Sequence, residues 1–141
     1  MKIVLDTNVL VAGLLSPFGL CAEIVRMVSS GDLVLCLDAR IISEYSEVLH
    51  RAKFRFRADK TEALLDFIEH HGYLVASSPL SDPLPDVDDQ PFLEVAIAGL
   101  ASCLVTGNHE HFPAARCAGV KVFSPREFLV FYRKQQKRRA R

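Results

Sequence analysis

Short, continuous apolar segments alternate along the chain with segments whose apolar residues recur every three or four positions. The continuous segments have the length of buried strands and cover residues 2–5, 33–37, 73–76, 103–105 and 120–123. The periodic segments predict helices over residues 7–15, 20–29, 39–49, 59–70 and 91–101, and from 125 onward. Strands that alternate with helices are typical of an α/β fold, here a three-layer α/β/α arrangement with a central parallel sheet of about five strands.

Turn and capping residues mark several of the expected boundaries. Gly72 follows the helix 59–70 and is expected to end it, and Pro91 fits the first turn of the next helix. Ser124 and Glu127 have the spacing of a capping box, which predicts a final helix that continues into the basic C-terminal residues. The segment 77–89, rich in Ser, Pro and Asp, is the longest expected loop.

The composition is that of one ordinary globular domain. The chain has 141 residues, of which 50% are hydrophobic and 24% are charged. The longest apolar run, residues 9–15, is too short to span a membrane, and Asp6 interrupts the apolar stretch that a signal peptide would need. None of the four cysteines has the spacing of a zinc or redox site, so Cys36 and Cys103 are expected to be small core residues. We therefore expect a reduced, cytoplasmic protein with no membrane segment.

The net charge of zero conceals an uneven distribution. Six of the 17 basic residues lie within 133–141, which we separate as a basic tail from a single domain, 1–132. The domain then carries 11 bases against 17 acids, a net charge of −6. Five of those acids fall between Asp82 and Glu94 with no base among them, and a cation is expected to offset the repulsion within this concentrated acidic patch.

Polar side chains follow three of the expected strands. Asp6 comes directly after the first strand, Asp38 after the second with Glu44 in the helix behind it, and Thr106-Gly107-Asn108 after the fourth. The acidic stretch 86–89 leads into the helix before the fourth strand. Because functional sites in parallel α/β folds lie at the carboxyl ends of the strands, several carboxylates and an amide are expected to meet at one edge of the sheet.

Each of these residues also has a purely structural interpretation. Asp6 fits the cap of the following helix, Glu44 an ordinary surface glutamate, and Asn108 a turn residue. One of Asp88 and Asp89 is expected to cap the helix that follows them. Taken together, however, carboxylate and amide oxygens suit Mg²⁺ or Mn²⁺, and the chain has no His pair or Cys pair spaced for zinc. Such a set is typical of nucleases and other phosphoryl-transfer enzymes.

Four motifs, in this order, resemble those of the PIN-domain family. They are Ile3-Val4-Leu5-Asp6-Thr7-Asn8-Val9-Leu10, Ile42-Ser43-Glu44-Tyr45, Asp86-x-x-Asp89-x-x-Phe92-Leu93 and Leu104-Val105-Thr106-Gly107-Asn108. The resemblance runs from about Lys2 to Phe131 and is greatest to the toxin (VapC-like) branch of type II toxin–antitoxin pairs. It implies a compact α/β/α domain that cleaves RNA with Mg²⁺ or Mn²⁺, a small antitoxin protein as partner, and a homodimer.

The resemblance also implies a role for each matched residue. Asp6, Glu44 and Asp89 match the metal-binding and catalytic acids of the family, Asp86 an accessory acid, and Asn108 a position held by Asp or Asn. Thr7 and Thr106 match hydroxyl positions that orient carboxylates, while Asn8 and Asp88 are supporting neighbours within the motifs. Many members carry a further acid two or three residues after the Asn108 position, where this chain has His109-Glu110-His111. Either Glu110 supplies that carboxylate or His111 replaces it, and we expect one firmly held ion with a second recruited by substrate.

A domain with a net charge of −6 needs basic segments to attract RNA. Residues 50–57 carry four fixed positive charges, on Arg51, Lys53, Arg55 and Arg57, with two interleaved phenylalanines that could stack on bases. The alternative for this segment is a solvated helix end with two core phenylalanines. The basic tail has three interpretations: an RNA contact, a contact for an acidic segment of an antitoxin, or a frayed, solvated end.

Two other enzyme classes with an Asp after the first strand fit less well. A haloacid-dehalogenase-type phosphatase needs a second Asp two residues later, where this chain has Asn8. A response-regulator receiver needs adjacent acids after the first strand and a lysine after the last, whereas Asp6 precedes Thr7 and Lys121 lies within the fifth strand. The alternative from a different class is a catalytically weak PIN-like domain that acts as an RNA- or protein-binding module.

Overall fold

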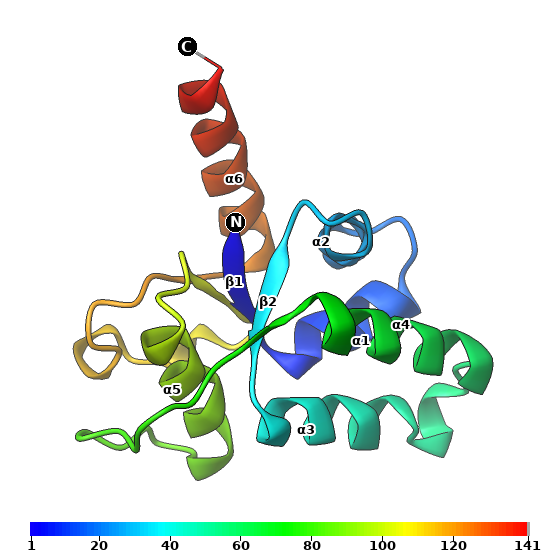
Figure 1. Cartoon of the computed structure of the whole chain (residues 1–141), viewed down its shortest axis with the longest axis horizontal. Coiled ribbons are helices and arrows are strands. Elements are labelled where there is room, and N and C mark those ends of the chain that lie inside the picture. The colour runs from blue at the N-terminus through cyan, green and yellow to red at the C-terminus, as the bar shows by residue number, and fades with distance from the viewer. Residues whose placement is uncertain (141) are drawn as a thin grey trace.

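A five-stranded, all-parallel sheet forms the centre of the computed structural model, which describes residues 1–140 (Figure 1). The strand order is β3-β2-β1-β4-β5, so the first strand lies in the middle of the sheet. β1 pairs with β2 on one side and with β4 on the other. The strands are β1 (Lys2–Leu5), β2 (Val34–Leu37), β3 (Tyr73–Leu74), β4 (Leu104–Val105) and β5 (Val122–Phe123).

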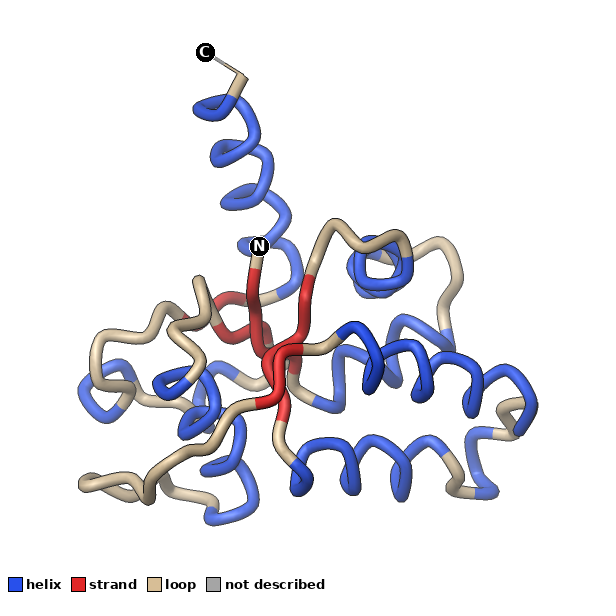
Figure 2. Tube along the Cα trace, in the orientation of Figure 1, coloured by secondary structure: helices blue, strands red, loops and turns tan. Residues whose placement is uncertain are grey.

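Helices cover both faces of this sheet, as Figures 1 and 2 show. α5 packs against β1, β2 and β4 on one side, whereas the first four helices pack against one another on the other side. The helices are α1 (Thr7–Leu15), α2 (Leu20–Ser29), α3 (Ala39–Leu49), α4 (Ala58–His71), α5 (Gln90–Ala98) and α6 (Pro125–Arg139), with short 3₁₀ helices η1 (Ala52–Phe54), η2 (Val87–Asp89), η3 (His109–His111) and η4 (Ala114–Arg116). This arrangement confirms the three-layer α/β/α fold that the alternating pattern predicts.

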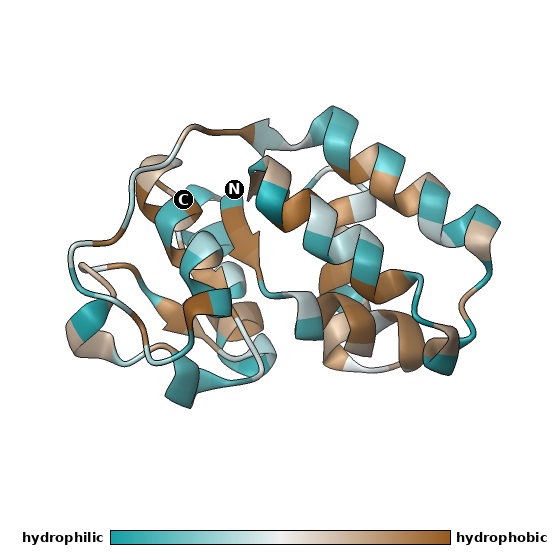
Figure 3. Ribbon diagram, turned by 90° about the horizontal axis from the view of Figure 1, so that it is seen from below, coloured by the Kyte–Doolittle hydropathy of each residue, from teal (hydrophilic) through white to brown (hydrophobic). Residues whose placement is uncertain are grey.

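The central strands are buried on both faces, which explains why they are continuous apolar runs in the sequence. Ile3, Val4 and Leu5 of β1 are all 0% exposed. Figure 3 shows these hydrophobic strands between helices whose outer faces are largely hydrophilic. Cys36 and Cys103 are buried in the same core, and all four cysteines are free, as the sequence predicts.

Two close contacts fix α3 against the carboxyl end of β1 and α1 against α2. Tyr45 of α3 is buried, and its hydroxyl donates a hydrogen bond to the Leu5 carbonyl. On α1, a Cβ at Gly13 would lie 2.6 Å from Val25 Cγ2 and 2.8 Å from the Cys21 carbonyl oxygen, so glycine is needed for α1 to approach α2 this closely. Both helices thereby have fixed positions around the residue that follows β1.

The helix predicted over 91–101 is shorter in the structure, where α5 ends at Ala98. Leu100 adopts a left-handed conformation with φ of 51°, and the Ala101 amide donates to the Ala96 carbonyl at 3.0 Å. This Schellman arrangement satisfies the last carbonyls of the helix and redirects the chain. Hydropathy did not reveal this end, because backbone hydrogen bonds determine it. Segments 73–76 and 120–123 likewise form only two-residue strands, and both lie at an edge of the sheet with one partner.

The last helix is longer than a domain of residues 1–132 requires. Its start has the predicted capping box, in which Ser124 Oγ accepts from the Glu127 amide and Glu127 Oε1 accepts from the Ser124 amide. α6 then continues to Arg139, and its last turns project beyond the sheet on the side of the N terminus (Figure 1). The expected tail is therefore helical over 133–139 instead of frayed, and Arg141 lies outside the described residues.

No single helix among residues 1–140 is long and apolar enough to cross a membrane. Only α1 and α2 taken together reach the required length and apolar content, and these two helices are bent by 103° at the break between them. Both belong to the core, where Leu10 is 1% exposed and Ile24 is 0% exposed.

Candidate metal centre

Asp6 lies buried at the junction of β1 and α1, on the carboxyl edge of the sheet. It occupies the position before α1, yet its side chain makes no capping hydrogen bond. Instead, Asp6 Oδ2 accepts hydrogen bonds from Thr106 Oγ1 at 2.8 Å and from Asn8 Nδ2 at 3.3 Å. Burial raises the pKa of this carboxyl group, and the Thr106 hydroxyl opposes only part of the rise. The structure thus excludes the interpretation of Asp6 as a simple helix cap.

Residues after β4 reach across to β1 and α1 and hold this edge together. Thr106 is completely buried, and its hydroxyl accepts a hydrogen bond from the Asn108 amide at 3.0 Å while it donates to Asp6. Asn8 Oδ1 accepts from the Gly107 amide at 3.1 Å. Asn108 therefore contributes through its backbone amide. Together these bonds fix the orientation of the Asp6 carboxylate.

Glu44 reaches the same edge from α3. Its side chain is half-buried, and Thr7 of α1 donates its hydroxyl hydrogen to Glu44 Oε2. Burial raises the pKa of Glu44, the Thr7 hydroxyl opposes this, and the charges of Asp6 and Asp88 add to the rise. Glu44 is thus more than an ordinary surface glutamate, because it interacts electrostatically with two other acids of the edge.

The aspartates of the acidic loop have different surroundings. Asp86 Oδ1 accepts a hydrogen bond from the Asp88 amide at 2.9 Å and so caps η2. Asp88 is exposed, whereas Asp89 is only 9% exposed. Asp89 precedes α5 without making a side-chain capping bond. The expected cap at Asp88 or Asp89 is therefore wrong, since the capping side chain of this loop is Asp86.

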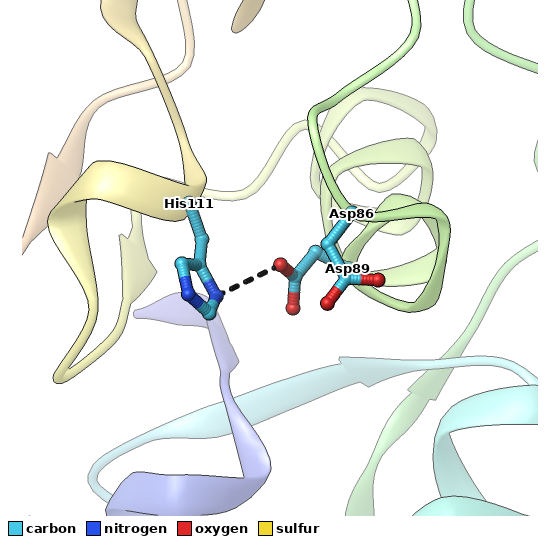
Figure 4. Close-up of side chains that lie close together, drawn as sticks. All are labelled: Asp86, Asp89 and His111. Atoms are coloured by element: carbon cyan, nitrogen blue, oxygen red, sulfur yellow. Dashed lines mark ion pairs between the residues drawn. The ribbon is translucent and has the colours of Figure 1, made fainter.

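His111 of η3 approaches Asp89 from the opposite side of the edge (Figure 4). Its Nδ1 lies 3.1 Å from Asp89 Oδ2, an oxygen that is buried and has no hydrogen-bond partner. Burial raises the pKa of Asp89 to about 6, the Asp6 charge adds to the rise, and the His111 imidazole opposes it. The protein alone therefore stabilises the negative charge of Asp89 poorly.

Asp86, Asp89 and His111 form a tight group of potential metal ligands. One ligand atom from each lies within 4.8 Å of the others. Figure 4 shows the imidazole and the two carboxylates pointing toward one another. Within residues 1–140, Asp6 and Glu44 are not members of this group, although the Asp6 charge raises the pKa of both Glu44 and Asp89.

The structure places His111, and not Glu110, beside Asp89. Glu110 is exposed, whereas His111 is half-buried and belongs to the ligand group. The sequence left both possibilities open, because adjacent residues in a short turn point in different directions. Only the position of η3 relative to Asp89 shows that the imidazole takes this place.

Other acids near the edge are neutralised by an arginine. Glu94 of α5 is 6% exposed, and its Oε1 accepts from Arg40 Nη1 at 2.7 Å. The same Arg40 pairs at 2.7 Å with Asp38, the acid that follows β2 and caps α3. Within the acidic run between Asp82 and Glu94, Arg40 therefore offsets the charge of Glu94. Asp38 and Glu94 form a separate structural cluster with Arg40.

The basic segment 50–57 already uses much of its charge and aromatic surface internally. Arg51 and Arg57 are both in exposed ion pairs of 2.9 Å. Phe54 and Phe56 are half-buried and stack on each other, with ring centroids 5.5 Å apart. Lys53 lies over the Phe54 ring at 5.1 Å. These contacts favour the structural interpretation of this segment over base stacking.

A comparison with known families agrees with this fold. The family model for the PIN domain matches residues 2–110. The chain belongs to the PIN-domain family. A comparison with curated proteins found no match. The match to the PIN domain contains Asp6, Glu44, Asp86 and Asp89 and stops one residue before His111, so β5 and α6 also lie beyond it.

The centre of this PIN domain suits a divalent cation, and PIN domains are typically metal-dependent nucleases. The decisive observation is the buried oxygen of Asp89 that has no hydrogen-bond partner. Asp6, Glu44 and Asp89 all have raised pKa values, which means that their negative charges lack compensation. A divalent cation would supply that compensation, and carboxylate oxygens and imidazole nitrogens both bind such ions.

Proposed function

We propose that this PIN domain is a metal-dependent endoribonuclease that hydrolyses RNA phosphodiester bonds. One observation carries the proposal: Asp89 keeps a buried carboxylate oxygen without a hydrogen-bond partner, beside Asp86 and His111 and within electrostatic range of Asp6. A buried carboxylate of this kind is destabilising unless a cation neutralises it. Acids that hold a divalent cation at a strand edge are a common basis for phosphodiester hydrolysis without a covalent intermediate.

The proposed roles of the side chains follow from their contacts. Asp6, Glu44 and Asp89 hold Mg²⁺ or Mn²⁺, with Asp86 as an accessory ligand. When bound, the cation would lower the pKa of a water molecule and polarise a phosphoryl oxygen of the substrate. Thr106 orients Asp6 and Thr7 orients Glu44 through their hydroxyl hydrogen bonds. Because these bonds exist before substrate binds, the carboxylates need little rearrangement during the reaction.

The basic face of α6 is the element that we expect to attract RNA. Five bases lie in its second half, and within residues 1–140 only Arg133 has an acidic partner, Glu23 at 3.3 Å. At about 100° per residue, residues 133, 134, 137 and 138 fall within about 140° of one helix face. A stripe of cations of this kind, of which only Arg133 has an acidic partner among residues 1–140, matches the phosphates of a polyanion. Since α6 projects away from the carboxyl edge, it would hold the flanking part of a long RNA (Figure 1).

The toxin role belongs to the same proposal. It is supported by the resemblance of the four motifs to the toxin branch, which implies a small antitoxin protein, a homodimer and action on cytoplasmic RNA. Expression of the chain in a bacterial host should arrest growth, whereas Asp6→Asn should not. Co-expression of the protein encoded by the neighbouring open reading frame should restore growth. Normal growth of cells that accumulate the folded wild type would contradict the toxin role.

A catalytically weak domain that binds RNA or protein is the alternative. One observation favours it: His111 already lies 3.1 Å from Asp89, so a protonated imidazole would neutralise that acid without any metal. Under this alternative, the domain binds RNA at the basic face of α6 and does not cleave it. The two functions differ in whether the protein cleaves RNA when a divalent metal ion is added.

Incubation of EDTA-treated protein with single-stranded RNA, with and without Mg²⁺ or Mn²⁺, tests the proposed activity. We expect cleavage only with metal, and products without 2′,3′-cyclic phosphate ends, because water and not the ribose 2′-hydroxyl is the nucleophile. Asp6→Asn, purified in the same way, controls for contaminating ribonuclease. RNA binding without cleavage at any metal concentration would support the binding-module alternative instead.

A further inference from the structure

The ligand group contains an imidazole as well as two carboxylates, and this combination affects which metal would bind. His111 Nδ1 lies 3.1 Å from Asp89 Oδ2, and ligand atoms of Asp86, Asp89 and His111 lie within 4.8 Å of one another. A site of carboxylates alone suits Mg²⁺, which prefers oxygen ligands and gives up its waters reluctantly. An imidazole nitrogen instead favours first-row transition ions.

The backbone holds His111 in this position. The His111 amide donates to the Asn108 carbonyl at 3.1 Å, and the Phe112 amide donates to the His109 carbonyl at 2.9 Å, which closes the η3 turn. Phe112 is only 3% exposed and anchors the turn in the core. Because the neighbouring residue is fixed in this way, the imidazole of His111 stays within reach of Asp89.

The ion pair between His111 and Asp89 lacks an aligned hydrogen bond. Asp89 Oδ2 has no hydrogen-bond partner although His111 Nδ1 is 3.1 Å away, so the ring N–H is not aligned to donate to it. Asp86 is a third member of the group and has one oxygen bonded to the Asp88 amide, which leaves the other oxygen available. A cation in contact with all three side chains would use the oxygen of Asp89 that the protein leaves without a hydrogen bond.

We propose that His111 binds the divalent cation together with Asp86 and Asp89, and that its nitrogen makes the site select Mn²⁺ over Mg²⁺. This inference rests on the metal site of the proposed function and adds the ligand that determines the choice of ion. Mn²⁺ accepts carboxylate oxygens as Mg²⁺ does. Because Mn²⁺ is a transition ion, it binds an imidazole nitrogen more readily than Mg²⁺, so the three side chains match it better than they match Mg²⁺.

Mn²⁺ binding to the full-length, metal-free protein, followed by the loss of the EPR signal of free Mn²⁺, tests this inference without turnover. Competition with Mg²⁺ in the same titration gives the Mg²⁺ affinity. We expect the wild type to bind Mn²⁺ at least ~10-fold more tightly than Mg²⁺. His111→Asn should lose ~10-fold or more of its Mn²⁺ affinity and less than ~3-fold of its Mg²⁺ affinity. Pulsed EPR should show nitrogen coupling to bound Mn²⁺ in the wild type and none in this variant.

His109→Asn is the matched control, because His109 lies in the same turn and pairs with Glu127 at 3.0 Å, outside the ligand group. It should leave both metal affinities unchanged. Equal Mn²⁺ affinity in the wild type and His111→Asn would overturn the inference. Tighter Mn²⁺ binding by His111→Asn would also overturn it, since His111 would then compete with the metal for Asp89. If neither ion binds the wild type, the metal site of the proposed function fails as well.

Discussion

Thr106 and Asp6 are 100 residues apart in the sequence, yet the Thr106 hydroxyl donates a hydrogen bond of 2.8 Å to the Asp6 carboxylate. The contact exists because β4 lies beside β1, so that the residues after the two strands meet at one edge of the sheet. Thr106 is 0% exposed and Asp6 is 6% exposed. The bond therefore orients a buried carboxylate that a metal ion would need in one orientation.

Asp6→Asn should abolish metal-dependent cleavage of RNA while the metal-free fold remains stable. The substitution is nearly isosteric and keeps an oxygen that accepts from Thr106. Burial raises the pKa of Asp6, which means that its charge destabilises the metal-free protein, so the melting temperature should hold or rise. Loss of an essential electrostatic group usually lowers the rate ~10²-fold or more, and we expect at least that in an RNA cleavage assay.

Asp38→Asn is the matched control for Asp6→Asn. Asp38 also follows a central strand, but it caps α3 and pairs with Arg40 instead of joining the metal centre. Asparagine caps helices as well as aspartate does, so this variant should retain activity within ~3-fold of wild type. Equal activity of Asp6→Asn and Asp38→Asn would remove Asp6 from the proposed mechanism.

Protonation of Asp89 should stabilise the metal-free protein at low pH. Its pKa is raised from the ordinary 3.8 to about 6, mainly by burial, so the folded protein binds this proton more tightly than the unfolded chain does. The resulting stability is fully present below about pH 4 and is lost as the pH rises through about 6. Asp89→Asn has no proton to lose at this position, so its stability should not fall in this way. In EDTA, the melting temperature of the variant minus that of the wild type should therefore increase by ~3 °C or more from about pH 4 to above pH 6. A constant difference between the two proteins across this range would contradict the raised pKa.

Thr106→Val should impair activity through the orientation of Asp6. Valine has the shape of threonine but can neither donate to Asp6 nor accept from the Asn108 amide. We expect a loss of ~1–3 kcal/mol of stability, because buried polar groups lose a partner, and a drop in RNA cleavage of ~10-fold or more.

Thr61→Val separates orientation from stability. Thr61 is also buried, at 4% exposure, but its hydroxyl donates to the Arg57 and Ala58 carbonyls within α4. Its substitution should lower the melting temperature without changing the rate of cleavage below that temperature. If both valine variants lose activity in proportion to stability, the Thr106 hydroxyl has no orienting role.

Neutralising the projecting cations of α6 should weaken RNA binding. In Lys134→Gln/Lys137→Gln/Arg138→Gln/Arg139→Gln, the helix remains but four charges are removed. Affinity for single-stranded RNA, measured in EDTA to prevent cleavage, should fall, and the slope of log affinity against log salt should become shallower by up to ~3, at about 0.7 per lost phosphate contact. Turnover at saturating RNA should stay nearly unchanged, because no acid of the metal centre is altered.

The comparison variant Arg51→Gln/Lys53→Gln/Arg55→Gln/Arg57→Gln removes the same number of charges from the other basic segment. Arg51 and Arg57 are already in ion pairs with acids, so this variant should affect RNA affinity less than the α6 variant does. A larger loss of RNA affinity in this variant than in the α6 variant would assign RNA binding to residues 51–57. If the α6 variant changes neither the affinity for RNA nor the salt slope, the basic face of α6 does not bind RNA. It would then be available to another partner, such as an acidic segment of an antitoxin.

The sequence by itself determined the order of strands and helices and therefore the α/β/α fold, because hydrophobic periodicity and capping residues act over short stretches of chain. The capping box at Ser124 and Glu127 is such a local signal, and the structure confirms it. Hydropathy failed where backbone conformation and backbone hydrogen bonds decide the outcome. The end of α5 at Ala98 depends on the conformation of Leu100, which hydropathy does not report.

The sequence also placed acids at the carboxyl edge of the sheet, because residues that directly follow parallel strands must lie there. It could not show which acids have their oxygens satisfied by hydrogen bonds. Glu94 belongs to the acidic run but accepts from Arg40, 54 residues away, whereas Asp89 keeps a buried oxygen without a hydrogen-bond partner. It also could not choose between Glu110 and His111 as the neighbour of Asp89. That choice depends on how the buried Phe112 anchors the η3 turn against the core, and only the packing of the tertiary structure sets this direction.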